Sequence, residues 1–159
     1  MLHRLRRTLR RRERLLHVRE LQEELAQQAL ATLLREEDRL KEERDAFVAS
    51  QQRTRQTIQS EMDSGAVPGE TFVVYARVME ALHALEEQKA HEIAAMQPRI
   101  TEHREEVLRR HKKKRAMEIL TAKTRESVQH EELRLEQRTL DDLTIQRHHG
   151  RHGNHGTEA

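Results

Sequence analysis

The chain of 159 residues contains no cysteine and no tryptophan, and only 2% of its residues are aromatic. Without cysteine it has neither disulfides nor thiolate metal ligands. Its longest apolar run, Phe72 to Ala76, is far shorter than the about 20 residues that a membrane-spanning helix requires. No apolar segment follows the basic N-terminus, so we expect no secretory signal, and an organellar transit peptide is a weaker alternative.

Apolar residues make up 35% of the chain and charged residues 36%. This apolar content is too low for a thick layered core, but it suffices for a coiled coil, which buries two positions in seven. Alanine, glutamate, lysine, leucine, arginine and glutamine dominate, and all of them favour helices. The composition predicts an all-α protein.

Glycine and proline are also scarce, yet three of them fall together before the middle of the chain, at Gly65, Pro68 and Gly69. Gly65 is suited to the left-handed conformation that closes a helix, and Pro68 with Gly69 is suited to a turn. Thr71 is a candidate N-cap for the following helix. The segment therefore predicts a turn between two helices.

Apolar residues recur at steps of three, four or seven on both sides of the turn, which is the spacing of a coiled-coil contact face. Together these faces predict a single domain over residues 1–146. Its first arm is residues 2–63, its turn 64–71 and its second arm 72–146. Pro98 lies inside the second arm and predicts a kink rather than a stop. Residues 147–159 have no periodicity and predict a disordered tail rich in histidine and glycine.

The contact face of the first arm is interrupted by charged residues. Those at apolar positions are Arg12, Arg19, Glu23, Glu37 and Arg44, and a second apolar stripe, Val18, Leu21 and Leu25, is offset from the first. We interpret these features as a contact face that drifts around the helix.

Two long helices joined by a short turn are expected to pack antiparallel, with residue numbers of facing pairs adding to about 133. This register sets Glu20, Glu23 and Glu24 against the basic run at 109–115. Such opposite charges help to fix the register. We therefore predict a long antiparallel two-helix coiled-coil hairpin whose second arm extends past the first.

No residue pattern indicates catalysis. His91-Glu92 lacks the second histidine of a zinc-binding helix, and His103 falls on the contact face. The tail histidines, His148, His149, His152 and His155, suit at most weak metal binding. We predict a protein that is not an enzyme, with no cofactor and no metal site.

Eight arginines lie within the first twenty residues. This basic end favours docking on an acidic protein surface. Three alternatives stay open: a nucleic-acid-binding helix, a helix on a membrane surface, and a solvated face without a partner.

The stretch "SEMDSGAVPGETFVVYARVMEALHALEEQ" resembles the central part of the FliJ family, the coiled-coil component of the flagellar type III export apparatus. The family has a helix end with Met and Gly, then a loop, then a Tyr followed by apolar residues at helical steps. The matching residues here are Met62, Gly65, Tyr75, Val78, Met79, Leu82 and Leu85. The second arm resembles the family's charged second arm, and the likeness covers about residues 1–145.

The resemblance implies a stalk-like coiled coil that inserts its terminal end in the ring of the export ATPase, FliI, couples the ring to the export gate protein FlhA, and assists substrate chaperones. It also implies a cytoplasmic protein at the inner membrane of the flagellar base. The ATPase contact would lie in residues 1–25 and 120–145, with Arg4, Arg7, Arg11 and Arg14. The gate contact would include Phe47, Val78, Leu82 and Leu85.

The chain departs from the family pattern at Ser50 and Thr54, where the family can have tyrosines, and at Lys89. We expect the rings of Phe72 and Tyr75 to pack in the contact face, and Val78 and Leu85 to lie on the surface. The alternatives are a nucleic-acid-binding coiled coil, a generic structural rod, and the equivalent stalk of an injectisome.

Overall fold

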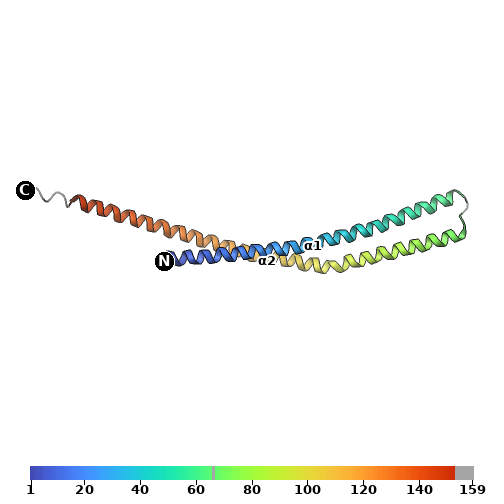
Figure 1. Cartoon of the computed structure of the whole chain (residues 1–159), viewed down its shortest axis with the longest axis horizontal. Helices are drawn as coiled ribbons and strands as arrows, with labels where there is room; N and C mark the ends of the chain where they lie inside the picture. Colours follow the sequence, from blue (N-terminus) through green and yellow to red (C-terminus); the bar gives the residue numbers. More distant parts are fainter. Residues whose placement is uncertain (66, 153–159) are drawn as a thin grey trace, which may run out of the picture. The chain divides into compact units, whose positions relative to one another are not determined.

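The computed structural model describes residues 1–65 and 67–152. It consists of two helices, α1 (Leu2–Asp63) and α2 (Gly69–His152) (Figure 1). The two helices pack against each other in antiparallel directions, and no strand occurs in the described ranges. The predicted all-α coiled-coil hairpin is therefore confirmed.

The chain divides into two structural units. The first comprises residues 1–23 with the chain from Arg110 onward, and the second comprises Glu24–Arg109, which includes the turn. Each unit contains a segment of α1 packed on a segment of α2.

The second unit contains the main apolar core. Leu33 and Leu40 of α1 pack with Ile93, Met96 and Ile100 of α2, and Ile100 is only 1% exposed. These residues follow one another at steps of three, four or seven, as expected for a coiled-coil face. The same face of α1 also buries Glu37 and Gln51.

The first unit has a thinner core. Leu5, Leu9 and Leu16 of α1 are half-buried, and Val128 of α2 is buried. Polar residues on α2 complete this core, since Thr121 and Thr124 are also buried.

The prediction that the contact face drifts around α1 is wrong. Val18, Leu21 and Leu25 are 46%, 46% and 65% exposed. The charged residues at heptad positions are instead buried or half-buried, namely Arg12, Arg19, Glu23, Glu37 and Arg44. The heptad thus continues unshifted. Arg12, Glu23 and Glu37 find polar partners on α2. Arg19 and Arg44 bond to Gln22 and Asp45 on α1 itself.

The turn follows the prediction at its first half. Gly65 has a φ of 104°, and its N–H donates to the carbonyl of Met62 over 3.3 Å. The second half differs, because α2 begins at Gly69 rather than at residue 72. The N–H of Thr71 donates to the carbonyl of Pro68 over 3.0 Å, so Thr71 lies inside the first turn and is not its N-cap. Proline's fixed φ suits this helix start.

The helix α2 runs through Pro98 without interruption and ends at His152 rather than at residue 146. Gly150 is therefore helical, and a single glycine costs a helix only about 1 kcal/mol. The rest of the predicted tail, residues 153–159, lies outside the described residues. Neither helix, over the residues that the structure describes, has an apolar stretch of the length that crossing a bilayer requires.

Candidate docking surfaces and the polar contact face

Buried polar residues connect the two helices in both units. In the first unit, Glu23 is 6% exposed and accepts contacts from Lys114 Nζ at 2.7 Å and His111 Nδ1 at 2.9 Å. The hydrogen bond from Lys114, and next that from His111, lowers the pKa of Glu23. The predicted contact of Glu23 with the basic run is confirmed.

In the second unit, Glu37 accepts from Gln97 Nε2 at 2.8 Å and pairs with Lys41 Nζ at 2.9 Å. Nearer the turn, Gln51 Nε2 donates to Glu86 at 2.6 Å. Each buried polar side chain of this unit's contact face therefore has a specific partner, which is the condition for burying such groups at low cost.

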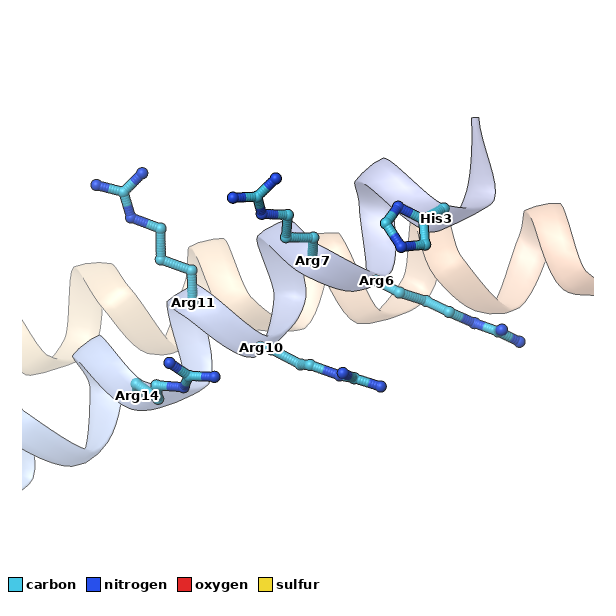
Figure 2. A pocket seen from close by; sticks show the side chains of 6 residues that line it. All are labelled: His3, Arg6, Arg7, Arg10, Arg11 and Arg14. Atoms are coloured by element: carbon cyan, nitrogen blue, oxygen red, sulfur yellow. The ribbon is translucent and has the colours of Figure 1, made fainter.

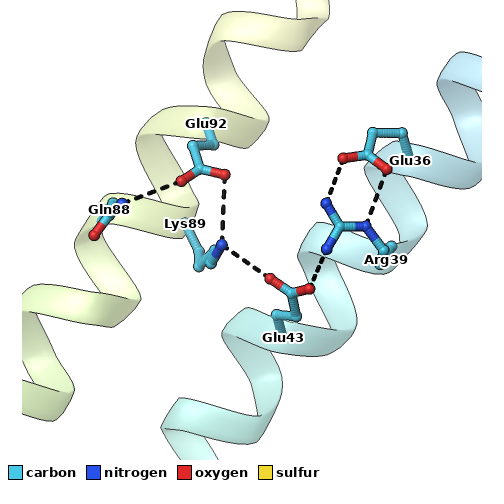
Figure 3. Close-up of polar contacts among 6 residues, drawn as sticks. All are labelled: Glu36, Arg39, Glu43, Gln88, Lys89 and Glu92. Carbon is cyan, nitrogen blue, oxygen red and sulfur yellow. Dashed lines mark hydrogen bonds and ion pairs between the residues drawn. The ribbon is translucent and has the colours of Figure 1, made fainter.

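The flank of the second unit carries a larger charge network (Figure 3). Lys89 Nζ on α2 lies 2.9 Å from Glu43 on α1 and 3.5 Å from Glu92. Glu43 also contacts Arg39, which binds Glu36. The hydrogen bond from Lys89 lowers the pKa of Glu43, and Glu36 raises the pKa of Arg39.

These cross-helix pairs fix the register. Their residue numbers add to values from 132, for Glu43 with Lys89, to 138, for Arg6 with Glu132. The predicted value of about 133 lies within this range.

The candidate ATPase-binding arginines lie on one exposed stretch of α1, and Figure 2 shows three of them, Arg7, Arg11 and Arg14. A surface groove there is lined by His3, Arg6, Arg7, Arg10, Arg11 and Arg14. We call these six residues, together with Arg4, the arginine face. Of this set, only Arg6 reaches α2, where it binds Glu132 at 2.6 Å.

Within the described chain, Arg4, Arg7, Arg11 and Arg14 form no ion pair, and all four are exposed. Arg12 differs because it points to α2, where it donates to the carbonyl of Leu120 over 3.1 Å and to the Thr124 hydroxyl. Sequence reasoning missed His3, Arg6 and Arg10 as groove residues. Arg10 was detectable, since it lies three residues after Arg7 and four before Arg14.

The four candidate gate-contact residues all lie in the second unit, but they differ in exposure. Val78 and Leu85 are 40% and 39% exposed, as predicted. Phe47 and Leu82 are half-buried at heptad positions. Val74, which sequence reasoning missed, is 59% exposed and lies one turn before Val78. Val74, Val78 and Leu85 form an apolar stripe at helical spacing, which we call the valine stripe.

The aromatic residues behind the turn behave differently from each other. Phe72 is 39% exposed, so the prediction that its ring packs in the contact face is wrong. Tyr75 is half-buried, as predicted, and its hydroxyl donates to Glu61 Oε1 over 2.9 Å. This hydrogen bond raises the pKa of Tyr75.

No set of three or more histidine, aspartate or glutamate side chains in the described part is arranged to hold a metal ion. What the structure defines is an antiparallel two-helix coiled coil with a polar contact face, an arginine face in one unit and a valine stripe in the other.

The sequence pattern of the family described as "Flagellar FliJ protein" matches residues 9–153. The chain therefore belongs to the FliJ family, and it is a coiled-coil protein associated with flagellar protein export. This family is a component of the export apparatus and not a family of enzymes. Comparisons with curated proteins and with solved structures give no significant match.

Proposed function

We propose that this protein is the stalk of the flagellar export ATPase. Its terminal end, formed by residues 1–25 and 120–145, inserts in the ring of the FliI-like ATPase. The protein couples the ring to the FlhA-like export gate, assists substrate chaperones, and works at the cytoplasmic face of the inner membrane at the flagellar base. Family membership supports the export role.

The observation that carries the proposal is the arginine face. Arg7, Arg11 and Arg14 are spaced by four and three residues, so their side chains share one side of α1. They are exposed and form no ion pair within the described residues. Like charges at this spacing destabilise an isolated helix slightly. An acidic partner surface offsets this repulsion and also accelerates association.

The test is charge reversal of three arginines, Arg7→Glu, Arg11→Glu and Arg14→Glu, in one variant. We expect its affinity for the purified export ATPase to fall by tenfold or more, measured by isothermal titration calorimetry. A control variant reverses three exposed arginines of the second unit, Arg53, Arg55 and Arg77. Equal affinity of the two variants contradicts the placement of the ATPase contact.

For the gate, the valine stripe is the best-supported contact, because it is apolar, exposed and off the contact face. Val78→Asp and Leu85→Asp are expected to weaken binding to the cytoplasmic domain of the gate protein. Leu108→Asp is a suitable control, since Leu108 is 55% exposed in the same unit. Unchanged binding by the first two variants places the gate contact elsewhere.

A nucleic-acid-binding coiled coil remains a second candidate because unpaired arginines on one helix side also suit phosphates. It predicts a mobility shift of duplex DNA that weakens steeply with salt and is lost when Arg7, Arg11 and Arg14 are reversed. Absence of a shift at about 50 mM salt eliminates this candidate.

A further inference from the structure

The segment of α2 from residue 133 to residue 150 is exposed throughout. It follows Glu132, which forms the ion pair with Arg6 near the start of α1. Five of its large apolar side chains are at least 38% exposed: Leu133, Leu135, Leu140, Leu143 and Ile145. We call residues 133–150 the overhang. Two of the five, Leu135 and Ile145, lie on the side of α2 that continues its contact face.

The heptad of the contact face continues into the overhang. After Val128, which is buried, and Glu131, which is half-buried, the next positions at steps of four and three are Leu135, Arg138, Asp142 and Ile145. Here, however, the positions are exposed, and over the described residues α1, which runs from Leu2 to Asp63, does not cover them. The overhang therefore presents four consecutive coiled-coil positions without a partner helix.

These four positions are complementary to themselves in the antiparallel direction. When two overhangs are paired about residue 140, Leu135 of one chain faces Ile145 of the other. Arg138 then faces Asp142. The two-fold symmetry makes each contact twice, which gives two apolar and two oppositely charged layers. In a parallel pairing, by contrast, Arg138 faces Arg138 and Asp142 faces Asp142, which is repulsive.

Arg138 and Asp142 have no ion pair within the described chain, although they are one turn apart on the same helix. Arg134, by comparison, contacts Glu131 at 3.6 Å. The two charges at the heptad positions are thus left for an external partner. A second copy of the chain supplies both opposite charges at the required spacing.

We propose that two copies of this protein associate reversibly through their overhangs, as a short antiparallel coiled coil centred on residue 140. The paired positions span ten residues, or about 15 Å of helix. Such a small interface predicts weak association, micromolar or weaker. Asp141 flanks the contact and faces its own copy, which limits the affinity further.

The association has a regulatory consequence, which rests on the proposed function. The overhang includes residues 133–145, which are half of the C-terminal part of the end assigned to the ATPase, residues 120–145. A self-paired overhang is not available to the ring, so self-association and ATPase binding compete. The dimer would then hold the protein inactive at high concentration until the ATPase is present.

Sedimentation equilibrium of the full chain tests the association without the ATPase, so its failure does not bear on the proposed function. We expect the average mass to rise from monomer toward dimer between about 5 and 500 µM. Arg138→Asp and Asp142→Arg are each expected to weaken association about tenfold or more, since each places like charges opposite each other. A monomer at all concentrations overturns the proposal.

The charge-swapped double variant, Arg138→Asp with Asp142→Arg, separates pairing from a general effect of charge. It is expected to restore the dimer, because the two opposite charges again face each other. Glu136→Lys, at an exposed position off the heptad, serves as the matched control and is expected to leave association unchanged. If the double variant is as weak as the single variants, these pairs do not form.

Disulfide trapping determines the direction of pairing, because the chain has no cysteine of its own. One preparation carries Leu135→Cys and is labelled with ¹⁵N, and the other carries Ile145→Cys. After mild oxidation of the mixture, mass spectrometry distinguishes the three dimers. We expect the disulfide that joins position 135 of one chain to position 145 of the other to form more often than random pairing of the two preparations would give. An excess of dimers joined through the same position overturns the antiparallel arrangement.

Discussion

Glu23 occupies a position where a coiled coil usually buries an apolar residue, and it is stabilised by Lys114 and His111. Because these hydrogen bonds lower its pKa, the ionised carboxylate stabilises the folded state at pH values above its ordinary pKa of about 4.3. This contribution to stability is lost as the pH falls through the lowered pKa that Glu23 has in the folded protein. We therefore expect this part of the stability to disappear in the acid range, below about pH 4.3.

The variant Glu23→Gln tests this expectation. It keeps the shape of the side chain but removes its charge, so its melting temperature is expected to fall by a few degrees at pH 7. At pH 3 the two proteins are expected to melt closer together, since the stabilisation from the ionised carboxylate is lost progressively as the pH falls below its ordinary pKa. Glu24→Gln, at an exposed neighbouring position, is the control. An equal difference at both pH values contradicts the role assigned to the charge.

Ile100 is the most deeply buried apolar side chain that the structure describes, at 1% exposure. Ile100→Ala removes buried methyl groups and leaves a cavity against Met96 and its neighbours, which is expected to lower the free energy of unfolding by about 2–4 kcal/mol. Leu108→Ala, on an exposed side of the same helix, is expected to change it by only about 0.5 kcal/mol. Urea denaturation followed by circular dichroism measures both. Similar losses would show that the core lies elsewhere.

At the scale of the element, the two glycines at the turn have opposite roles. Gly65 has a φ of 104°, which alanine adopts only with strain, so Gly65→Ala is expected to cost about 1–2 kcal/mol. Gly69 opens α2 with ordinary helical geometry and open space around its Cα. Gly69→Ala is expected to stabilise the protein by about 0.4–1 kcal/mol, because it reduces the entropy of the unfolded chain.

Thermal denaturation of the two variants compares these effects under identical conditions. The two variants can be compared directly, because each substitution adds one methyl group at an exposed site. Opposite shifts of the melting temperature are expected. Shifts of the same sign would mean that the backbone at Gly65 is free to relax.

The two helices and their register were predictable from sequence because heptad steps and the turn residues are local patterns. The boundaries were not, since α2 begins at Gly69, before Thr71, and Gly150 does not end it. From sequence alone, the charged residues in the contact face of α1 indicate a face that drifts around the helix. The burial of Glu23 is not predictable because it depends on Lys114, which is distant in sequence. For the same reason, sequence identified the exposed Arg7 but not the inward contact of Arg12 with Thr124.

At the scale of the whole molecule, the buried apolar residues are distributed unevenly between the two units. Of the six buried hydrophobic side chains that the structure describes, five lie in the second unit, and only Val128 lies in the first. Burying one such side chain contributes about 1.5–3 kcal/mol, whereas polar pairs contribute less. The helix segments of the first unit are therefore expected to open more easily than those of the second.

Native-state hydrogen exchange tests this difference in the intact chain. Amides in residues 30–40 and 93–100 are expected to exchange at least about tenfold more slowly than those in 5–16 and 117–128, because about 1.4 kcal/mol of local stability corresponds to tenfold. The exposed residues 133–150 provide an internal reference and are expected to exchange fastest in dilute solution, where the overhang is unpaired. Equal protection in both units would mean that the polar pairs around Glu23 and Arg12 stabilise the first unit as strongly as apolar packing stabilises the second.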